Sequence, residues 1–377
     1  MLLNVFIGAY ALVIAALYFF LPLYLKGTLG FSGARIGLLY AVLSITSLVV
    51  SFPVGVTGDR YPARLLTQVG LGATAVSLFG LAAVTDFWPF LAVFWLFGLS
   101  LQLFRQSLDI LLFKDNPGGE ARRFGGYNAW RMSGMLVGIL LGGLILQTLP
   151  FPTLFRLFAL GLICLFCLTF FLPRTRGQRI ELGQYARDFH RGPVLFFALW
   201  LFLFTLHWGA EGTSLGLFLQ EGLGLTPWGM GLYLAGEFGT VALTSYVYGR
   251  FLEGRLPPLV FLILGLATSG LGHLCMTQPP LAWSFAWRLV HGVGDGFIAM
   301  LTYTTIARLF HVDRIGGNSG LISLTTTLGV LTGSLIFGPL GAAWGYGWPL
   351  IISGAISLAL IPLVYLGLRR PAGSAPA

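Results

Sequence analysis

The chain has 377 residues, of which 56% are hydrophobic and only 9% are charged, and its mean hydropathy is +0.85. A soluble domain has about 25% charged residues, so this composition excludes the soluble globular class and indicates an integral membrane protein. The formal net charge of +9 does not indicate nucleic-acid binding, because most of the basic residues lie in turns between long apolar segments.

Apolar segments long enough to cross a bilayer as helices, about 20 residues each, follow one another along the chain. The twelve predicted spans are 3–25, 33–57, 65–85, 87–113, 125–148, 152–173, 194–219, 227–249, 258–277, 281–307, 316–338 and 345–368. The apolar runs are continuous and lack the alternation of a membrane β-barrel, so we predict an all-α protein. The first run lacks the basic start of a signal peptide and is expected to remain as a span.

The distribution of basic residues predicts the orientation. With the N-terminus inside the cell, Lys and Arg concentrate in the even-numbered turns, and the opposite side carries only Lys26 and Arg35. The positive-inside rule then places both termini in the cytoplasm. We therefore predict a multi-pass protein of the cell's inner (plasma) membrane.

The longest polar stretch, 174–193, is predicted to be a cytoplasmic linker with a short amphipathic helix on the membrane surface. It separates two halves, 1–173 and 194–377, that repeat each other in sequence. FGGYNAWRMSGMLVGILLGGLI at 124–145 and IGGNSGLISLTTTLGVLTGSLI at 315–336 align with their Gly-Gly pairs and two later glycines in register. Parallel halves with a site between them are typical of alternating-access transporters.

The turn after the second predicted span reads GVTGDRYPAR and combines glycines, an acid and two bases: Gly55, Gly58, Asp59, Arg60 and Arg64. A weaker copy follows the eighth span, with Gly249, Glu253 and Arg255. Glycines allow two helices to approach closely, and an acid at a helix end can meet the positive N-terminus of another helix.

These motifs resemble the signature of the major facilitator superfamily, although Pro62 and Ala63 replace the family's usual neighbours. The resemblance covers essentially the whole chain and implies twelve transmembrane helices in two pseudo-symmetric six-helix halves. It also implies that Asp59 latches the cytoplasmic gate in the outward-facing state, with Arg60 and Arg64 organising the cluster.

Ionisable side chains inside spanning helices are costly, and they mark functional sites. The candidates for proton coupling are Glu237, Glu211, Asp295, His207, His291 and Asp109. A buried carboxylate that alternately loses and regains access to water can carry a proton. Glu237 has no cation in its own helix, so we expect it to be protonated at rest. The alternative is a set of fixed pairs, such as Arg105 with Asp109 or Arg288 with Asp295.

A further set of residues is expected to shape the substrate pocket: Arg105, Arg131, Arg288, Trp208, Trp287, Asn128 and Tyr10. In the fifth span, GMLVGILLGG resembles the superfamily's antiporter signature, with Ile139 in place of its proline. The matching glycines are Gly134, Gly138, Gly142 and Gly143. This match favours export, although glycines every four residues also pack helices closely in any transporter.

We therefore expect a secondary active transporter that works by alternating access and exports small organic molecules in exchange for protons. One alternative is a proton-coupled symporter that imports a sugar, nucleoside or similar solute. A less favoured alternative, a non-transporting receptor or scaffold, would not need several buried ionisable groups. No nucleotide-binding loop or nucleophile elbow is present, so no enzyme activity, cofactor or metal is expected. The expected partners are a small-molecule substrate, protons and the lipid bilayer, without nucleic acid, and the protein is expected to be monomeric.

Overall fold

The computed structural model describes residues 2–114, 120–175, 177–178 and 180–369, and the described part of the chain is helical without any strand. The first six long helices are α1 (Leu2–Leu23), α2 (Gly33–Arg60), α3 (Ala63–Ala83), α4 (Phe87–Lys114), α5 (Glu120–Leu146) and α6 (Phe151–Leu168). The next six are α8 (Gly192–Ala210), α9 (Pro227–Val247), α10 (Pro258–Met276), α11 (Leu281–Leu309), α12 (Ile315–Trp344) and α13 (Gly347–Arg369). They follow the order of the twelve predicted spans, which confirms the predicted all-α membrane fold.

Short segments extend or join these helices. Four of them are π-helical, and three of these continue a long helix almost without a break; the other two have three residues each in 3-10 geometry. The segments are η1 (Tyr24–Thr28), η2 (Thr169–Phe171), η3 (Glu211–Leu215), η4 (Phe218–Gly222), η5 (Tyr248–Leu252) and η6 (Val312–Arg314). The linker contains the short helix α7 (Leu182–Phe189), while residues 176 and 179 of the linker lie outside the described residues.

Ten of the helical stretches are long and apolar enough to cross a membrane, judged over the described ranges. The two long helices that fall short of this threshold are α9 and α11. Glu237 lies in α9, and Arg288, His291 and Asp295 lie in α11. The same ionisable side chains that make these two helices functional candidates lower their apolar character.

The turn before α2 is repeated before α9. Gly30 and Gly224 both adopt a left-handed backbone conformation, with φ of 66° and 65°, which glycine adopts without steric cost. Two residues later, Ser32 and Thr226 cap the next helix, accepting from Arg35 N at 3.4 Å and Gly229 N at 3.2 Å. Each half of the sequence thus builds this turn in the same way.

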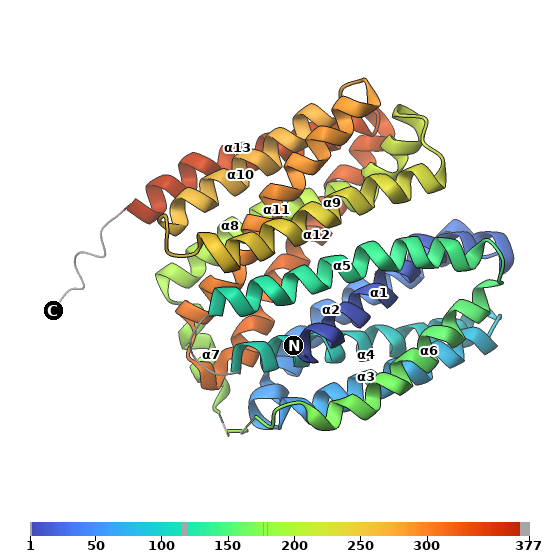
Figure 1. Ribbon diagram of the computed structural model, residues 1–377, viewed down its shortest axis with the longest axis horizontal. Coiled ribbons are helices and arrows are strands. Elements are labelled where there is room, and N and C mark those ends of the chain that lie inside the picture. The colour runs from blue at the N-terminus through green and yellow to red at the C-terminus, as the bar shows by residue number, and fades with distance from the viewer. Residues whose placement is uncertain (1, 115–119, 176, 179, 370–377) are drawn as a thin grey trace. The chain divides into compact units, whose positions relative to one another are not determined.

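The chain forms two compact units. Unit 1 comprises Met1–Gly119, Trp130–Phe189 and Ile306–Thr327, and unit 2 comprises Glu120–Ala129, His190–Thr305 and Leu328–Ala377. Within unit 1, α3 lies beside α4 and α6, and α2 lies beside α4 (Figure 1). Within unit 2, α13 lies beside α10 and α8 (Figure 1). The expected boundary between halves at 174–193 stays a prediction.

Glycines bring helix backbones into contact in each unit. In unit 1, a Cβ added at Gly134 or Gly138 of α5 would overlap the backbone of Gly8 or Leu12 in α1. One turn further along α5, Gly142 meets Ala16 of α1. In unit 2, Gly333 of α12 meets the carbonyl of Leu206 in α8 in the same manner. The glycine motif of the fifth span therefore has a packing role, whatever it contributes to transport, and Gly143 beside it is half-buried.

Candidate functional site

Seven ionisable side chains meet inside unit 2, and we call them the charged cluster. They come from four long helices and η3: His207 (α8), Glu211 (η3), Glu237 (α9), His273 (α10), and Arg288, His291 and Asp295 (α11). Arg288, His291 and Asp295 share one face of α11 because they are spaced three and four residues apart. All seven are buried except Glu211, whose side chain retains 16% exposure. Five of the six predicted proton-coupling residues lie in this cluster.

Arg288 joins two of the carboxylates. Its Nη1 donates to Glu211 Oε1 and its Nη2 donates to Glu237 Oε2. The fixed pair considered from the sequence, Arg288 with Asp295, is not among the ion pairs of the described residues. Asp295 is seven residues from Arg288 on α11, which is about two helical turns. Glu211 of η3 and Glu237 of α9 instead reach the guanidinium. Glu237, which has no cation in its own helix, therefore receives one from α11.

One imidazole nitrogen faces all three carboxylates. His291 Nε2 lies 3.2 Å from Glu211 Oε1, 3.6 Å from Asp295 Oδ1 and 3.8 Å from Glu237 Oε1. Its ring is fully buried, and Nε2 has no partner in hydrogen-bonding geometry among the described residues. His291 is thus the geometric centre of the cluster's acids.

Asp295 is held by donors from two further helices. Trp208 Nε1 in α8 donates to Asp295 Oδ2 at 2.9 Å, and Ser269 Oγ in α10 donates to Oδ1 at 2.9 Å. His207 Nε2 lies 3.4 Å from Asp295 Oδ2. Trp208, predicted as a pocket residue, therefore contacts a charged residue directly.

His273 belongs to the cluster, and the sequence analysis missed it. Its Nε2 lies 3.0 Å from Glu211 Oε1, and its ring stacks on His291 with centroids 4.1 Å apart and planes 9° apart. It stands within the predicted span 258–277. Applying the rule for ionisable residues inside spans to every histidine would have found it.

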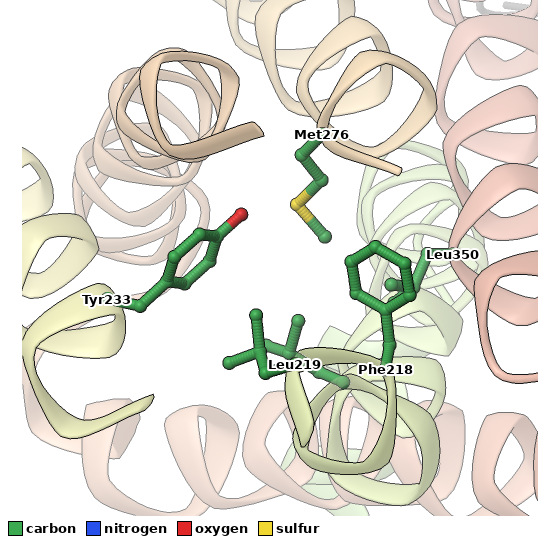
Figure 2. Close-up of a cluster of buried hydrophobic side chains, with 6 residues drawn as sticks. Phe218, Leu219, Tyr233, Met276 and Leu350 are labelled. Carbon is green, nitrogen blue, oxygen red and sulfur yellow. The ribbon is translucent and has the colours of Figure 1, made fainter. Parts of the chain in front are cut away.

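An apolar group lies against the charged cluster. Figure 2 shows Phe218, Leu219, Tyr233, Met276 and Leu350 converging from different helices, and Leu215 completes the group. Met276 Sδ lies 4.0 Å from Arg288 Nη1, so the two groups touch. Trp287, another predicted pocket residue, packs against this apolar group and pairs edge-on with Trp283. Apolar neighbours exclude water and strengthen the electrostatic interactions beside them.

Two triads of the charged cluster have the composition of a metal site: His207 with His291 and Asp295, and Glu211 with His273 and His291. In each triad the ligand-type atoms lie within 4.8 Å of one another, and imidazole and carboxylate are ligands of Zn²⁺. However, Glu211 Oε1 already accepts from the Arg288 guanidinium, and its positive charge disfavours a second cation at that oxygen. The absence of a metal stays a prediction.

A smaller polar group lies in unit 1. Arg105 Nη1 pairs with Asp109 Oδ2 at 3.3 Å, and Arg105 Nη2 donates to Ser323 Oγ at 2.9 Å. Tyr10 lies within electrostatic range of Arg105, Arg131 and Asp109. The alternative of a fixed Arg105–Asp109 pair is thus present in the structure, beside two of the predicted pocket residues.

Asp59 receives four donors at the end of α2. Its carboxylate accepts from Gly316 N at 3.0 Å and Gly317 N at 2.7 Å, at the N-terminus of α12. Tyr185 Oη donates at 3.0 Å, and Lys114 Nζ lies 2.9 Å away. An acid at a helix N-terminus is stabilised by the unpaired N–H groups and by the helix dipole. Asp59 itself is completely buried.

The arginines of the same motif bond to backbone carbonyls. Arg60 Nη2 donates to Ile180 O at 3.0 Å, and Arg64 Nη1 donates to Phe170 O at 3.0 Å. Gly58, two residues before Arg60, is buried. These bonds tie the motif to the linker, at Ile180, and to the segment just before it, at Phe170.

Helix α7 contributes residues that the sequence did not single out. Asp188 accepts from Arg314 Nε at 2.7 Å and from Asn318 Nδ2 at 2.9 Å. Burial raises the pKa of the Tyr185 phenol above its ordinary value, and the Asp59 carboxylate raises it further. Tyr185 therefore remains a hydrogen-bond donor at physiological pH.

The weaker motif copy is arranged differently. A Cβ on Gly249 would overlap the carbonyl of Ala121, so the start of α5 and η5 approach closely. Glu253 and Arg255 are exposed. Nearby, Asn128 Nδ2 donates to Ser245 Oγ at 2.7 Å, which gives this predicted pocket residue a contact between helices.

The family model described as Major Facilitator Superfamily matches residues 3–259 and 202–377. The chain belongs to the major facilitator superfamily. This confirms the resemblance drawn from the glycine-rich motif, and the twelve-helix fold in two six-helix halves is that of the superfamily. The protein is a multi-pass membrane transporter rather than an enzyme.

Named relatives and a solved structure agree with the superfamily assignment. The multidrug resistance protein MdtG of Salmonella paratyphi A is 25% identical over 374 residues, covering 93% of this chain and 90% of the relative. A multidrug resistance protein B homolog of Mycobacterium tuberculosis is 24% identical over 152 residues; this match covers 40% of the chain and 27% of the relative. The human organic anion transporter MFSD10 (TETRAN) has the same fold, with a TM-score of 0.79, 16% identity and coverage of 96% and 98%.

Proposed function

We propose that this superfamily member exports small organic molecules in exchange for protons, by alternating access. The observation that carries the proposal is the charged cluster of unit 2, in which three carboxylates share the neighbourhood of His291 and Arg288. Burying ionisable groups in a membrane protein costs free energy, so such groups mark functional sites. Binding and releasing protons is a function that requires them.

The balance of charges in the cluster favours proton exchange over a fixed structural role. Glu211, Glu237 and Asp295 outnumber the one permanent cation, Arg288. In a low-dielectric site the excess negative charge is costly, and protons can neutralise it. Opening the site to water on one side of the membrane would let these protons leave.

Two features favour export over import. Relatives at 24–25% identity are named multidrug resistance proteins, and one of them aligns with 93% of this chain. The glycines of α5 also match the antiporter signature of the superfamily, apart from Ile139. A proton symporter that imports a sugar or nucleoside is the second candidate, because the same cluster can couple protons to either direction of solute movement.

Asp59 is proposed to act as a gate latch, because its carboxylate binds the N-terminus of α12 through two backbone N–H groups. Arg60 and Arg64 would hold the motif in place through their backbone bonds. Following the distribution of basic residues, we place this latch and both termini on the cytoplasmic side of the inner membrane. We propose a monomer with halves 1–173 and 194–377 joined by the linker.

The test is substrate-driven proton movement in proteoliposomes that contain a pH-sensitive dye, with drugs, sugars and nucleosides screened on the wild type. Glu237→Gln is the test variant, and Glu221→Gln, an exposed acid of the same unit, is the matched control. Glu237→Gln removes one negative charge from the cluster, so export predicts a proton flux opposite to the solute that Glu237→Gln lowers and Glu221→Gln retains. A flux in the same direction as the solute would establish import instead, and solute transport without any proton flux would overturn proton coupling.

A further inference from the structure

The buried histidines of the charged cluster all direct the same ring nitrogen away from the acids. His291 Nδ1 lies 2.9 Å from the Ser269 carbonyl oxygen, and His207 Nδ1 lies 2.5 Å from the Phe204 carbonyl oxygen. A carbonyl oxygen only accepts, so both Nδ1 atoms carry a hydrogen and donate it. The protonation state of each ring is therefore decided at its Nε2.

His273 reaches the same tautomer through a serine. Its Nδ1 lies 3.0 Å from Ser353 Oγ, and that hydroxyl donates its only hydrogen to the Leu350 carbonyl at 3.0 Å. The hydroxyl must then accept from His273, so Nδ1 of this ring is also protonated. Three separate contacts thus assign the same tautomer to the three rings.

Each of the three Nε2 atoms faces a carboxylate oxygen. His207 Nε2 faces Asp295 at 3.4 Å, His273 Nε2 faces Glu211 at 3.0 Å, and His291 Nε2 faces Glu211 at 3.2 Å. A neutral ring of this tautomer would present a lone pair to an oxygen lone pair, which is repulsive. A proton on Nε2 replaces this repulsion with an attraction between opposite charges.

The charges set the number of protons. Glu211, Glu237 and Asp295 bring three negative charges and Arg288 brings one positive charge, so an excess of two negative charges remains when the imidazoles are neutral. Tyr233, a titratable group within electrostatic range of these residues, donates its hydroxyl hydrogen toward Ser284 and adds no charge. Burial of a net charge in a membrane protein is costly, so neutrality requires two added protons.

We propose that the charged cluster holds two protons at rest, shared among the Nε2 atoms of His207, His273 and His291. The imidazoles rather than the carboxylates hold them, because imidazole is the stronger base, with ordinary pKa values of about 6.5 against about 4. Glu237, which pairs with Arg288, is then ionised at rest, and this replaces the expectation from the sequence that it is protonated. Two protons on three positions leave one ring neutral. Since His291 Nε2 lies within 4 Å of all three carboxylates, a proton can pass from one ring to another by way of His291, and the neutral ring then changes. Whether these two protons are coupled to solute movement rests on the proposed function. Their presence in the cluster does not depend on it.

The test counts charged histidines by nitrogen NMR of the wild type, labelled at histidine and held in lipid nanodiscs. At about pH 7.5, one unit above the ordinary imidazole value of about 6.5, exposed rings are mostly neutral. The chain has five histidines, and His190 and His311 are exposed and serve as internal references. The expected spectrum has two charged and one neutral ring among the buried three, each protonated at Nδ1. Any other count of charged buried rings, or a ring protonated only at Nε2, overturns the proposal.

Variants make the count specific. Removing one carboxylate charge, by Glu237→Gln or independently by Asp295→Asn, lowers the number of charged rings from two to one. Glu221→Gln is the matched control and leaves it at two. An unchanged count in a folded Glu237→Gln or Asp295→Asn protein contradicts the charge argument, and the wild-type count stands if either variant fails to fold. Two charged rings in a protein that moves no protons with solute would overturn the proposed function and leave this inference intact.

Discussion

The hydroxyl of Tyr185 donates to Asp59 Oδ2 at 3.0 Å, and both residues are buried. This bond connects helix α7 of the linker to the acid of the glycine-rich motif. Asp59 also binds the first backbone N–H groups of α12, at Gly316 and Gly317. The linker helix is thus part of the same bonded group as the proposed gate latch.

Tyr185→Phe is expected to lower the thermal stability of the purified protein. The substitution removes one hydrogen bond to a buried carboxylate, a contribution of about 1.5–3 kcal/mol for bonds to charged groups. Tyr246→Phe, at a tyrosine with 51% exposure, is the matched control and is expected to leave the melting temperature unchanged. Equal melting temperatures for Tyr185→Phe and the wild type would show that the bond contributes nothing measurable.

The stabilising effect of Tyr185 should depend on pH in one direction. Burial raises its pKa above the ordinary value of 10.0, so the folded protein holds the phenol proton more tightly than the unfolded chain. The contribution is fully present below about pH 10 and is lost as pH rises through the raised value. Melting curves of wild type and Tyr185→Phe should therefore differ by a constant amount from pH 6 to 9 and converge in more alkaline buffer. A difference that grows with alkalinity would reverse the sign of this argument.

Much of the fold could be predicted from the sequence, because membrane helices are set by long apolar runs and their ends by charged turns. The glycine-rich motif could also be located, since its residues lie close together along the chain. The bonding partners that come from distant segments of the chain could not be predicted. That Arg288 joins Glu211 and Glu237, or that Tyr185 reaches Asp59, depends on how helices pack, and one sequence does not contain that pairing. His273 is different, because its place inside a predicted span was visible.

Gly55→Ala is expected to destabilise the protein strongly. A Cβ at Gly55 would overlap the carbonyl oxygen of Gly316, and backbone atoms can yield only by moving the helices apart. Overpacking of this kind costs about 1–3 kcal/mol or more. Gly161→Ala is the control, because a Cβ there meets nothing within 4 Å and alanine favours helix. Yield and melting temperature of the two variants measure the difference; equal values would contradict the close approach.

Arg288→Gln should destabilise the protein more than Glu237→Gln. Removing the guanidinium leaves Glu211 and Glu237 without the arginine that pairs with both, and breaking a buried pair in this way costs about 3–5 kcal/mol. Glu237→Gln instead lowers the excess of negative charge. The double variant should regain part of the stability lost in Arg288→Gln, which a thermal-unfolding cycle in detergent measures. Strict additivity of the two effects would show that the residues do not interact.

His273→Asn should slow proton exchange without lowering the number of bound protons. Three imidazole Nε2 positions holding two protons include one vacancy, and removal of the His273 ring leaves two positions for two protons. Without a vacant position a proton cannot move within the cluster, and it leaves only when its own ring is exposed to water. We therefore expect the initial proton flux in proteoliposomes to fall by up to about a hundredfold, the lower end of what a positioned acid–base group supplies. The nitrogen spectrum of the same variant should still show two charged buried rings. Loss of flux together with loss of a charged ring would mean that His273 holds a proton permanently, and the vacancy would then lie elsewhere in the cluster.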